Sequence, residues 1–200
     1  MDLVDIIVYT GIFVFAITGA LKARTHRMDI FGACVIAFVN AYGGGTIRDL
    51  LIGTRPINWL NDYLALILVI SAVIITFLLK RGLHRFQRTI IITDAIGIGM
   101  FTVVGIERSL ANGINDVYAV LMGVISATFG GLVVDIISNT VPSLLKRGEL
   151  YATACAIGGG LYMLLLHYPI SHDINLVICV LTIVAIRIVS IRKSWQLPEI

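Results

Sequence analysis

FVNAYGGGTIRD at residues 38–49 and VISATFGGLVVD at residues 124–135 decide how this chain folds. The two stretches lie 86 positions apart, and at that offset two glycines and an aspartate align. The aligned residues are Gly44 with Gly130, Gly45 with Gly131 and Asp49 with Asp135. Working outward at the same offset, further pairs recur: Gly11 with Gly97, Phe15 with Phe101, Gly19 with Gly105, Thr54 with Thr140 and Pro56 with Pro142. These residues are not the Leu and Ile that any two membrane helices share. We therefore interpret the chain as containing an internal repeat.

The composition indicates that the repeat is embedded in a membrane. Of the 200 residues, 58% are hydrophobic and 14% are charged, against about 45–50% and 25% in soluble domains. The chain contains seven apolar runs of 17 to 23 residues: 3–20, 30–52, 63–79, 89–106, 117–138, 150–168 and 174–191. About 20 apolar residues span a bilayer as a helix. The sequence therefore predicts an all-α membrane protein with seven transmembrane helices in a single domain, residues 1–200.

The repeat arranges these helices as three, three and one. Repeat A covers about residues 3–80, repeat B covers about residues 89–168, and the seventh helix at 174–191 stands outside both. An odd number of helices in each copy makes the second copy enter the membrane from the opposite side. The result is an inverted repeat, which is a recurrent plan of transport proteins.

The basic residues predict the orientation. Twelve Lys and Arg fall on one side and three on the other, and the positive-inside rule places the richer side in the cytoplasm. The N-terminus is then outside and the C-terminus cytoplasmic. The pI near 8.9 reflects this bias and does not indicate nucleic-acid binding, and the basic loops also favour anionic membrane lipid. The richer side holds Lys22, Arg24, Arg27, Lys80, Arg81, Arg85, Arg88, Lys146, Arg147, Arg187, Arg192 and Lys193, and the poorer side holds Arg48, Arg55 and Arg108.

Glycine runs interrupt the second and fifth helices at matching positions. Gly43, Gly44 and Gly45 stand in the second helix, and Gly130 and Gly131 stand in the fifth. Each glycine destabilises a helix by roughly 1 kcal/mol relative to alanine, so we expect kinks or unwound turns there. Paired breaks at mirrored depths indicate a permeation or binding site. The alternative interpretation is that the glycines only let helices pack closely.

Charged residues follow both glycine runs. A charge at membrane depth faces protein or water, so Asp49, Asp135 and Asp94 are candidates to contact a permeating cation. A structural ion pair or a cap is the alternative for the first two. Arg48 has Val134 at its equivalent position, and this asymmetry suggests a gate or a tether. Uncharged residues that could continue the pathway are Thr18, Thr46, Thr102 and Ser138.

The sequence lacks the motifs of several other function classes. It holds no phosphate-binding glycine loop with lysine, no HExxH and no Cys/His cluster. We therefore expect no enzyme activity, no cofactor, no bound metal cofactor and no ATP-driven pumping.

Two motifs carry a resemblance to a known family. GGGTIRDLLIG at residues 43–53, followed by Pro56 and Trp59, and DAIGIGMFTVVG at residues 94–105 resemble the prokaryotic trimeric intracellular cation (TRIC) channels. Some relatives in that family carry a glycine-transporter label. The resemblance covers essentially the whole chain.

The resemblance implies a homotrimer in a prokaryotic cell membrane, with one pore inside each subunit. It implies a pathway along helices one, two, four and five, and passage of monovalent cations, chiefly K⁺. Phe129 stands where a third glycine would complete the symmetric pattern, and we interpret it as a hydrophobic gate. The alternative function is a secondary transporter of a small amino acid such as glycine, because inverted repeats and broken helices serve both classes.

Overall fold

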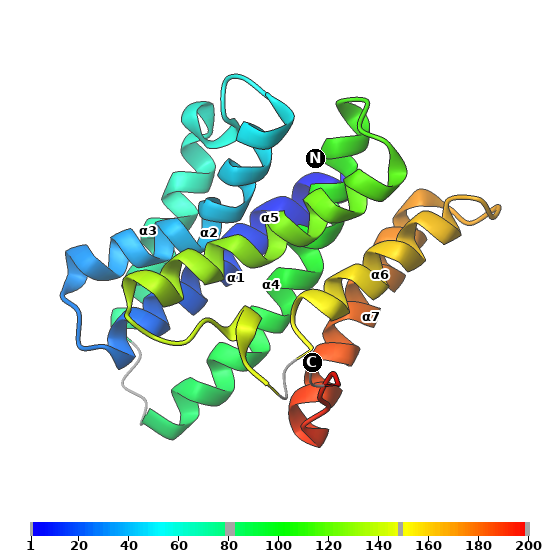
Figure 1. The fold of residues 1–200 in the computed structure, drawn as a ribbon. Coiled ribbons are helices and arrows are strands. Elements are labelled where there is room, and N and C mark those ends of the chain that lie inside the picture. Colours follow the sequence, from blue (N-terminus) through cyan, green and yellow to red (C-terminus); the bar gives the residue numbers. More distant parts are fainter. Residues whose placement is uncertain (1, 79–82, 148–149, 199–200) are drawn as a thin grey trace.

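A computed structural model describes residues 2–78, 83–147 and 150–198, without the side chains of residues 83–86. Within these ranges the chain forms seven α-helices and two short 3-10 helices (Figure 1). The helices are α1 Leu3–Thr25, α2 Ile30–Ile52, η1 Asn58–Asn61, α3 Tyr63–Leu78, α4 Leu83–Ala111, α5 Asp116–Ile137, η2 Ser143–Leu145, α6 Ala152–Leu165 and α7 His172–Lys193. The end predicted for repeat A, with Lys80 and Arg81, lies outside the described residues.

Five of these helices are long and apolar enough to cross a membrane: α1, α2, α4, α5 and α7. The third helix of each repeat is shorter, with 16 residues in α3 and 14 in α6. Figure 1 shows α1, α4 and α5 in the middle of the bundle, α2 and α3 on one side, and α6 and α7 on the other. The predicted all-helical fold is confirmed, although α6 is shorter than the apolar run that predicted it.

The same helix crossing is built twice, once in each repeat. A Cβ atom on Gly19 of α1 would lie 2.7 Å from the Cα atom of Ala37 in α2. A Cβ atom on Gly105 of α4 would lie 2.8 Å from the Cα atom of Gly123 in α5. Each of these residues is 86 positions from its counterpart, so both repeats join their first two helices at equivalent points. Such close approach is possible only where the side chain is absent.

Reciprocal contacts join the two repeats. The rings of Phe15 on α1 and Phe101 on α4 stack with their centroids 5.1 Å apart and their planes 4° from parallel. Gly11 faces the ring of Phe101, and its equivalent Gly97 faces the ring of Phe15. Contacts that are exchanged in this way are the signature of a two-fold interface. The pseudo-two-fold axis of the inverted repeat therefore passes beside this aromatic pair.

The glycine runs bring α2 and α5 into backbone contact. A Cβ atom on Gly44 would collide with the backbone of Ser126, and one on Gly130 would lie 2.5 Å from the carbonyl oxygen of Asn40. These contacts are again reciprocal, and they support the close-packing interpretation directly. Both helices continue through their glycines without interruption. The expectation of unwound turns is therefore wrong, because the backbone hydrogen bonds persist there, and a bend of the helix axes stays a prediction.

Candidate functional site

Two cavities are lined in part by equivalent residues of the two repeats. The first, of about 120 Å³, lies beside Asp49 and Arg108, and we call it the Asp49 cavity. The second, of about 290 Å³, lies beside Asp135 and Lys22, and we call it the Asp135 cavity. Asp135 is the counterpart of Asp49, and Lys22 is the counterpart of Arg108. The inverted repeat therefore places a carboxylate and a basic residue beside each cavity.

Asp49 stands near the end of α2 and is fully partnered. Arg48 donates to its Oδ1 atom from Nη2 at 2.6 Å and from Nε at 3.0 Å. Asn58, at the start of η1, donates from Nδ2 to its Oδ2 atom at 3.0 Å. The carboxylate therefore neutralises a buried guanidinium and also fixes the loop that follows the helix.

Arg48 joins two helices in this structure, and its role as a gate or a tether stays a prediction. Its Nη1 atom donates to the hydroxyl of Ser126 on α5 at 3.0 Å. The side chain thus links α2 to α5 just beyond their glycine crossing. Beside it, Trp59 donates from Nε1 to the hydroxyl of Thr46 at 2.9 Å, so Thr46 lines the Asp49 cavity as a partner of the loop.

Asp135 occupies the position in repeat B that Asp49 occupies in repeat A, but it pairs with a different basic residue. Lys22 of α1 donates to its Oδ1 atom at 2.7 Å, and the backbone N–H of Ser143 donates to its Oδ2 atom at 2.8 Å. The backbone N–H groups of Thr54 and Thr140 donate to the carbonyls of Asp49 and Asp135, each at 2.9 Å. Both aspartates are therefore structural pairs and caps that also line a cavity, and their contact with a permeating ion stays a prediction.

Asp94 joins a cluster that the sequence did not indicate. The hydroxyl of Tyr151 donates to its Oδ1 atom at 2.9 Å, and Nη2 of Arg187 lies 3.8 Å from its Oδ2 atom. The guanidinium carbon of Arg187 stands 4.4 Å from the centre of the Tyr151 ring. Since Asp94 and Arg187 both line the Asp135 cavity, α7 contributes a charge to this site from outside the repeat.

Two basic residues were therefore misassigned from sequence. Lys22 and Arg187 were counted as loop residues on the basic side, but Lys22 pairs with a carboxylate at the cavity and Arg187 is buried in α7. Basic residues near the ends of apolar runs are usually expected at the membrane–water interface. That expectation hid the buried positions of both residues. A signal for Lys22 was present, because it stands 86 positions before Arg108. Arg187 has no counterpart in a repeat and offered none.

The remaining pathway candidates are spread along the helices. Thr18 donates to the hydroxyl of Thr93 at 2.7 Å, and Thr102 donates to the carbonyl of Ile98 on its own helix at 2.7 Å. The hydroxyl of Ser138 is buried, with no hydrogen-bond partner among the described residues. Phe129 is half-buried and lines neither cavity, so its proposed role as a gate has no geometric support here.

Of the aromatic pair, Phe101 lines the Asp49 cavity and Phe15 lines neither cavity. On α1, Phe15 lies between Ile12, which lines the Asp49 cavity, and Lys22, which lines the Asp135 cavity. On α4, Phe101 lines the Asp49 cavity, and Asp94, about two turns away, lines the other. The described residues contain no group of three or more His, Cys, Asp or Glu side chains that could hold a metal ion.

The chain matches one family model twice. The model, described as Glycine transporter, matches residues 5–81 and residues 91–167. The two matches begin 86 positions apart, which is the offset of the internal repeat. The family is therefore itself defined by a unit that this chain contains in two copies.

Two relatives match almost the whole chain. The UPF0126 membrane protein of Vibrio cholerae is 39% identical over 191 residues, which cover 94% of this chain and 79% of that protein. The UPF0126 inner membrane protein YadS of Escherichia coli is 33% identical over 190 residues, which cover 94% of this chain and 91% of that protein. Both relatives are named as membrane proteins, in agreement with the apolar helices described above.

A solved structure shares the whole fold. The TRIC trimeric intracellular cation channel orthologue from Rhodobacter sphaeroides superposes with a TM-score of 0.90 at 31% identity, covering 98% of this chain and 100% of that chain. The resemblance inferred from the glycine motifs is thereby confirmed. This multi-pass membrane protein belongs to the family of the UPF0126 membrane proteins and the prokaryotic TRIC channels.

Proposed function

We propose that the chain is a passive channel for monovalent cations, with K⁺ preferred and one pathway inside each subunit of a homotrimer. The observation that carries the proposal is the pair of cavities related by the inverted repeat. Each has a buried carboxylate at its wall, and Phe101, whose ring stacks on that of Phe15, lines the Asp49 cavity. The named function of the R. sphaeroides relative, a trimeric cation channel, supports the same conclusion.

Carboxylate oxygens line both cavities beside basic side chains, which are Arg48 and Arg108 in the Asp49 cavity and Lys22, Lys146 and Arg187 in the Asp135 cavity. Asp49 and Asp135 are each paired with a basic side chain in this structure, so neither is a bare charge. Asp94 adds a carboxylate to the Asp135 cavity. When a K⁺ ion enters, these oxygens supply ligands in place of lost hydration, while Lys22 can move along its flexible side chain toward water.

The aromatic pair is the barrier of this pathway. Two stacked rings present no hydrogen-bonding group along the axis, and hydrophobic constrictions stop ion flow by excluding water. Opening therefore requires the rings of Phe15 and Phe101 to separate. Because each ring packs against a glycine of the opposite repeat, the small residues at 11 and 97 give the rings a surface along which to slide.

The proposed orientation is N-terminus outside and C-terminus in the cytoplasm, in the cell membrane of a prokaryote. The Asp49 cavity then opens outside and the Asp135 cavity opens to the cytoplasm. The basic side chains support this orientation, since Arg24, Arg27 and Arg192 stand at one end of the bundle.

Electrical recording tests the function directly. Purified protein is placed in a planar bilayer under a KCl gradient, and unitary steps that reverse near the K⁺ equilibrium potential are expected. Replacing KCl by NaCl on one side measures the K⁺ preference, and native mass spectrometry measures the subunit number. A silent bilayer together with glycine counterflow in liposomes would overturn the channel in favour of a transporter.

A double variant tests the barrier. Phe15→Ala with Phe101→Ala is expected to raise the open probability, since the described pathway then has no aromatic constriction. Phe129→Ala is the matched control and is expected to leave conduction unchanged. If only the control variant conducts more, the barrier lies at Phe129 and the axial pair is structural.

A further inference from the structure

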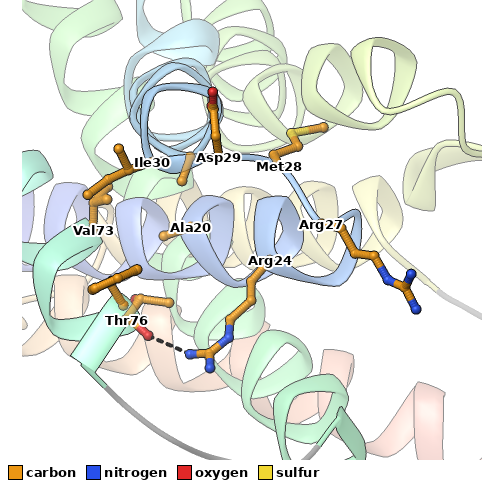
Figure 2. A pocket seen from close by; sticks show the side chains of 10 residues that line it. Ala20, Arg24, Arg27, Met28, Asp29, Ile30, Val73 and Thr76 are labelled. Carbon is orange, nitrogen blue, oxygen red and sulfur yellow. Dashed lines mark hydrogen bonds between the residues drawn. The ribbon is translucent and has the colours of Figure 1, made fainter.

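A third cavity lies outside the proposed pathway, between α1, α2 and α3 (Figure 2). Its volume is about 270 Å³, and it shares no lining residue with the Asp49 or Asp135 cavity. We call it the Arg24 cavity. Its walls come from the end of α1, the start of α2 and the last turns of α3, so it lies near one end of the bundle.

The walls combine polar and apolar groups. The guanidinium of Arg24 reaches the end of α3, where Nη1 donates to the carbonyl of Thr76 at 2.8 Å (Figure 2). The hydroxyl of Thr76 is buried in the same wall and has no hydrogen-bond partner among the residues that the structure describes. Ala20 and Val73 form the apolar part. The Thr76 hydroxyl can therefore donate to a ligand that enters this cavity.

The equivalent place in repeat B is closed. Ala20 corresponds to Ile106 and Thr76 corresponds to Tyr162, and both larger side chains are fully buried. Ile106 also packs against Gly159, with 3.1 Å between its Cδ1 atom and a Cβ atom built on that glycine. The cavity therefore exists because repeat A has small side chains where repeat B has large ones.

Repeat A also adds positive charge where repeat B has none. Arg24 corresponds to Leu110, and Arg27 corresponds to Gly113. Arg27 and Gly113 both adopt the left-handed conformation, with φ angles of 55° and 76°. A residue other than glycine is disfavoured there by roughly 1–2 kcal/mol, so an arginine stands where a glycine would be more stable. Around the Arg24 cavity the two repeats thus differ in side-chain volume, in charge and in the conformational energy of the backbone.

Exposed apolar side chains stand at the mouth of the cavity. Ile30 and Phe77 line it and are 56% and 67% exposed, as expected for side chains that contact acyl chains. Figure 2 shows Arg27 extending outward beside this mouth. A ligand here meets the guanidinium of Arg24 and apolar side chains. The carboxylate of Asp29 is also in the lining, and it accepts from the backbone N–H of Gly32 at 2.7 Å. That combination excludes a free inorganic anion as the best fit.

We propose that the Arg24 cavity binds an anionic phospholipid. Its phosphate accepts hydrogen bonds from Arg24 and from Arg27, which folds back over the mouth, and the hydroxyl of Thr76 donates to a phosphate or glycerol oxygen. The first part of an acyl chain packs along Val73 and Phe77. Basic pockets between transmembrane helices bind anionic head groups in this way, and arginine does so with paired hydrogen bonds.

Native mass spectrometry of the detergent-purified protein tests this site without reference to conduction. Phosphatidylglycerol is expected to remain bound where phosphatidylcholine does not. Arg24→Gln and Arg27→Gln are each expected to weaken phosphatidylglycerol binding about tenfold, since each removes a charge-assisted hydrogen bond. The matched control is Arg192→Gln, which removes the same charge from the exposed end of α7 and is expected to change nothing.

A filling variant separates the site from general electrostatics. Ala20→Ile places the residue of repeat B in the cavity and keeps every charge. It is expected to exclude phosphatidylglycerol while the protein elutes as a single folded species. The proposal is overturned if Arg192→Gln loses as much lipid as Arg24→Gln, if Ala20→Ile binds normally, or if glycerol phosphate alone competes as well as the intact lipid.

Discussion

At each end of the proposed pathway a basic side chain pairs with an equivalent aspartate, but the basic residue differs. At one end Asp49 is held by Arg48, its neighbour in the sequence, and the side chains are 2% and 4% exposed. At the other end Asp135 is held by Lys22 from a different helix, and the side chains are 8% and 14% exposed. The carboxylates are equivalent, and both anchor the loop that follows their helix. The Asp49 pair is therefore a fixed local joint within α2, whereas the Asp135 pair joins α1 to α5 and is slightly more exposed.

The largest effect is expected at the fixed joint. Asp49→Asn leaves the buried guanidinium of Arg48 without its counter-charge, so the free energy of unfolding should fall by about 3 kcal/mol. Thermal unfolding in detergent measures this loss. The double variant with Arg48→Gln should recover most of it, because the unpaired charge is gone. An equal loss in the single and double variants would contradict the assigned pair.

A smaller loss is expected at the helix crossing. Gly130→Ala brings a methyl group within 2.5 Å of the carbonyl of Asn40, and overpacking of this kind lowers the free energy of unfolding by about 1–3 kcal/mol. Gly44→Ala should lose a similar amount, because its contact with Ser126 is the equivalent one. Thermal unfolding of both variants tests the symmetry. If Gly130→Ala alone is destabilised, the two repeats do not cross in the same way.

The Asp135 end should respond mainly in conduction. Lys22→Gln leaves a carboxylate that water can reach, so the loss of stability should be about 1 kcal/mol, while single-channel K⁺ current rises because a competing cation has been removed. Bilayer recording and thermal unfolding measure the two effects. A loss as large as that of Asp49→Asn, with unchanged current, would make Lys22 as fixed as Arg48.

The smallest effect is expected at the neighbouring glycine. A Cβ atom on Gly45 would have only the Nη2 atom of Arg48 nearby, at 3.8 Å. Gly45→Ala should therefore be neutral or stabilising by up to about 1 kcal/mol, since alanine favours the helix. Thermal unfolding measures the sign. Strong destabilisation would indicate that this glycine bends α2, as first predicted from the sequence.

The sequence was most informative where both repeats retain the same residue. The pairs Phe15–Phe101 and Asp49–Asp135 predicted the inverted plan and the two ends of the pathway. It could not separate a kink from a close crossing at the glycines, because both require the same absent side chain. It also could not place Arg187, whose position depends on how α7 packs. The Arg24 cavity depends on side-chain volumes at Ala20 and Thr76, which apolar periodicity does not register.

Arg187 has one further consequence. A pore with two identical mouths would carry equal currents at equal and opposite voltages. Here a helix outside the repeat adds a buried guanidinium to the Asp135 cavity, and the other mouth receives nothing equivalent from such a helix. Fixed charge that differs between the mouths makes the local concentration of cations differ as well. In the proposed pathway, Arg187 of the seventh helix therefore adds to the difference between the two mouths, and the expected current differs in size between equal and opposite voltages.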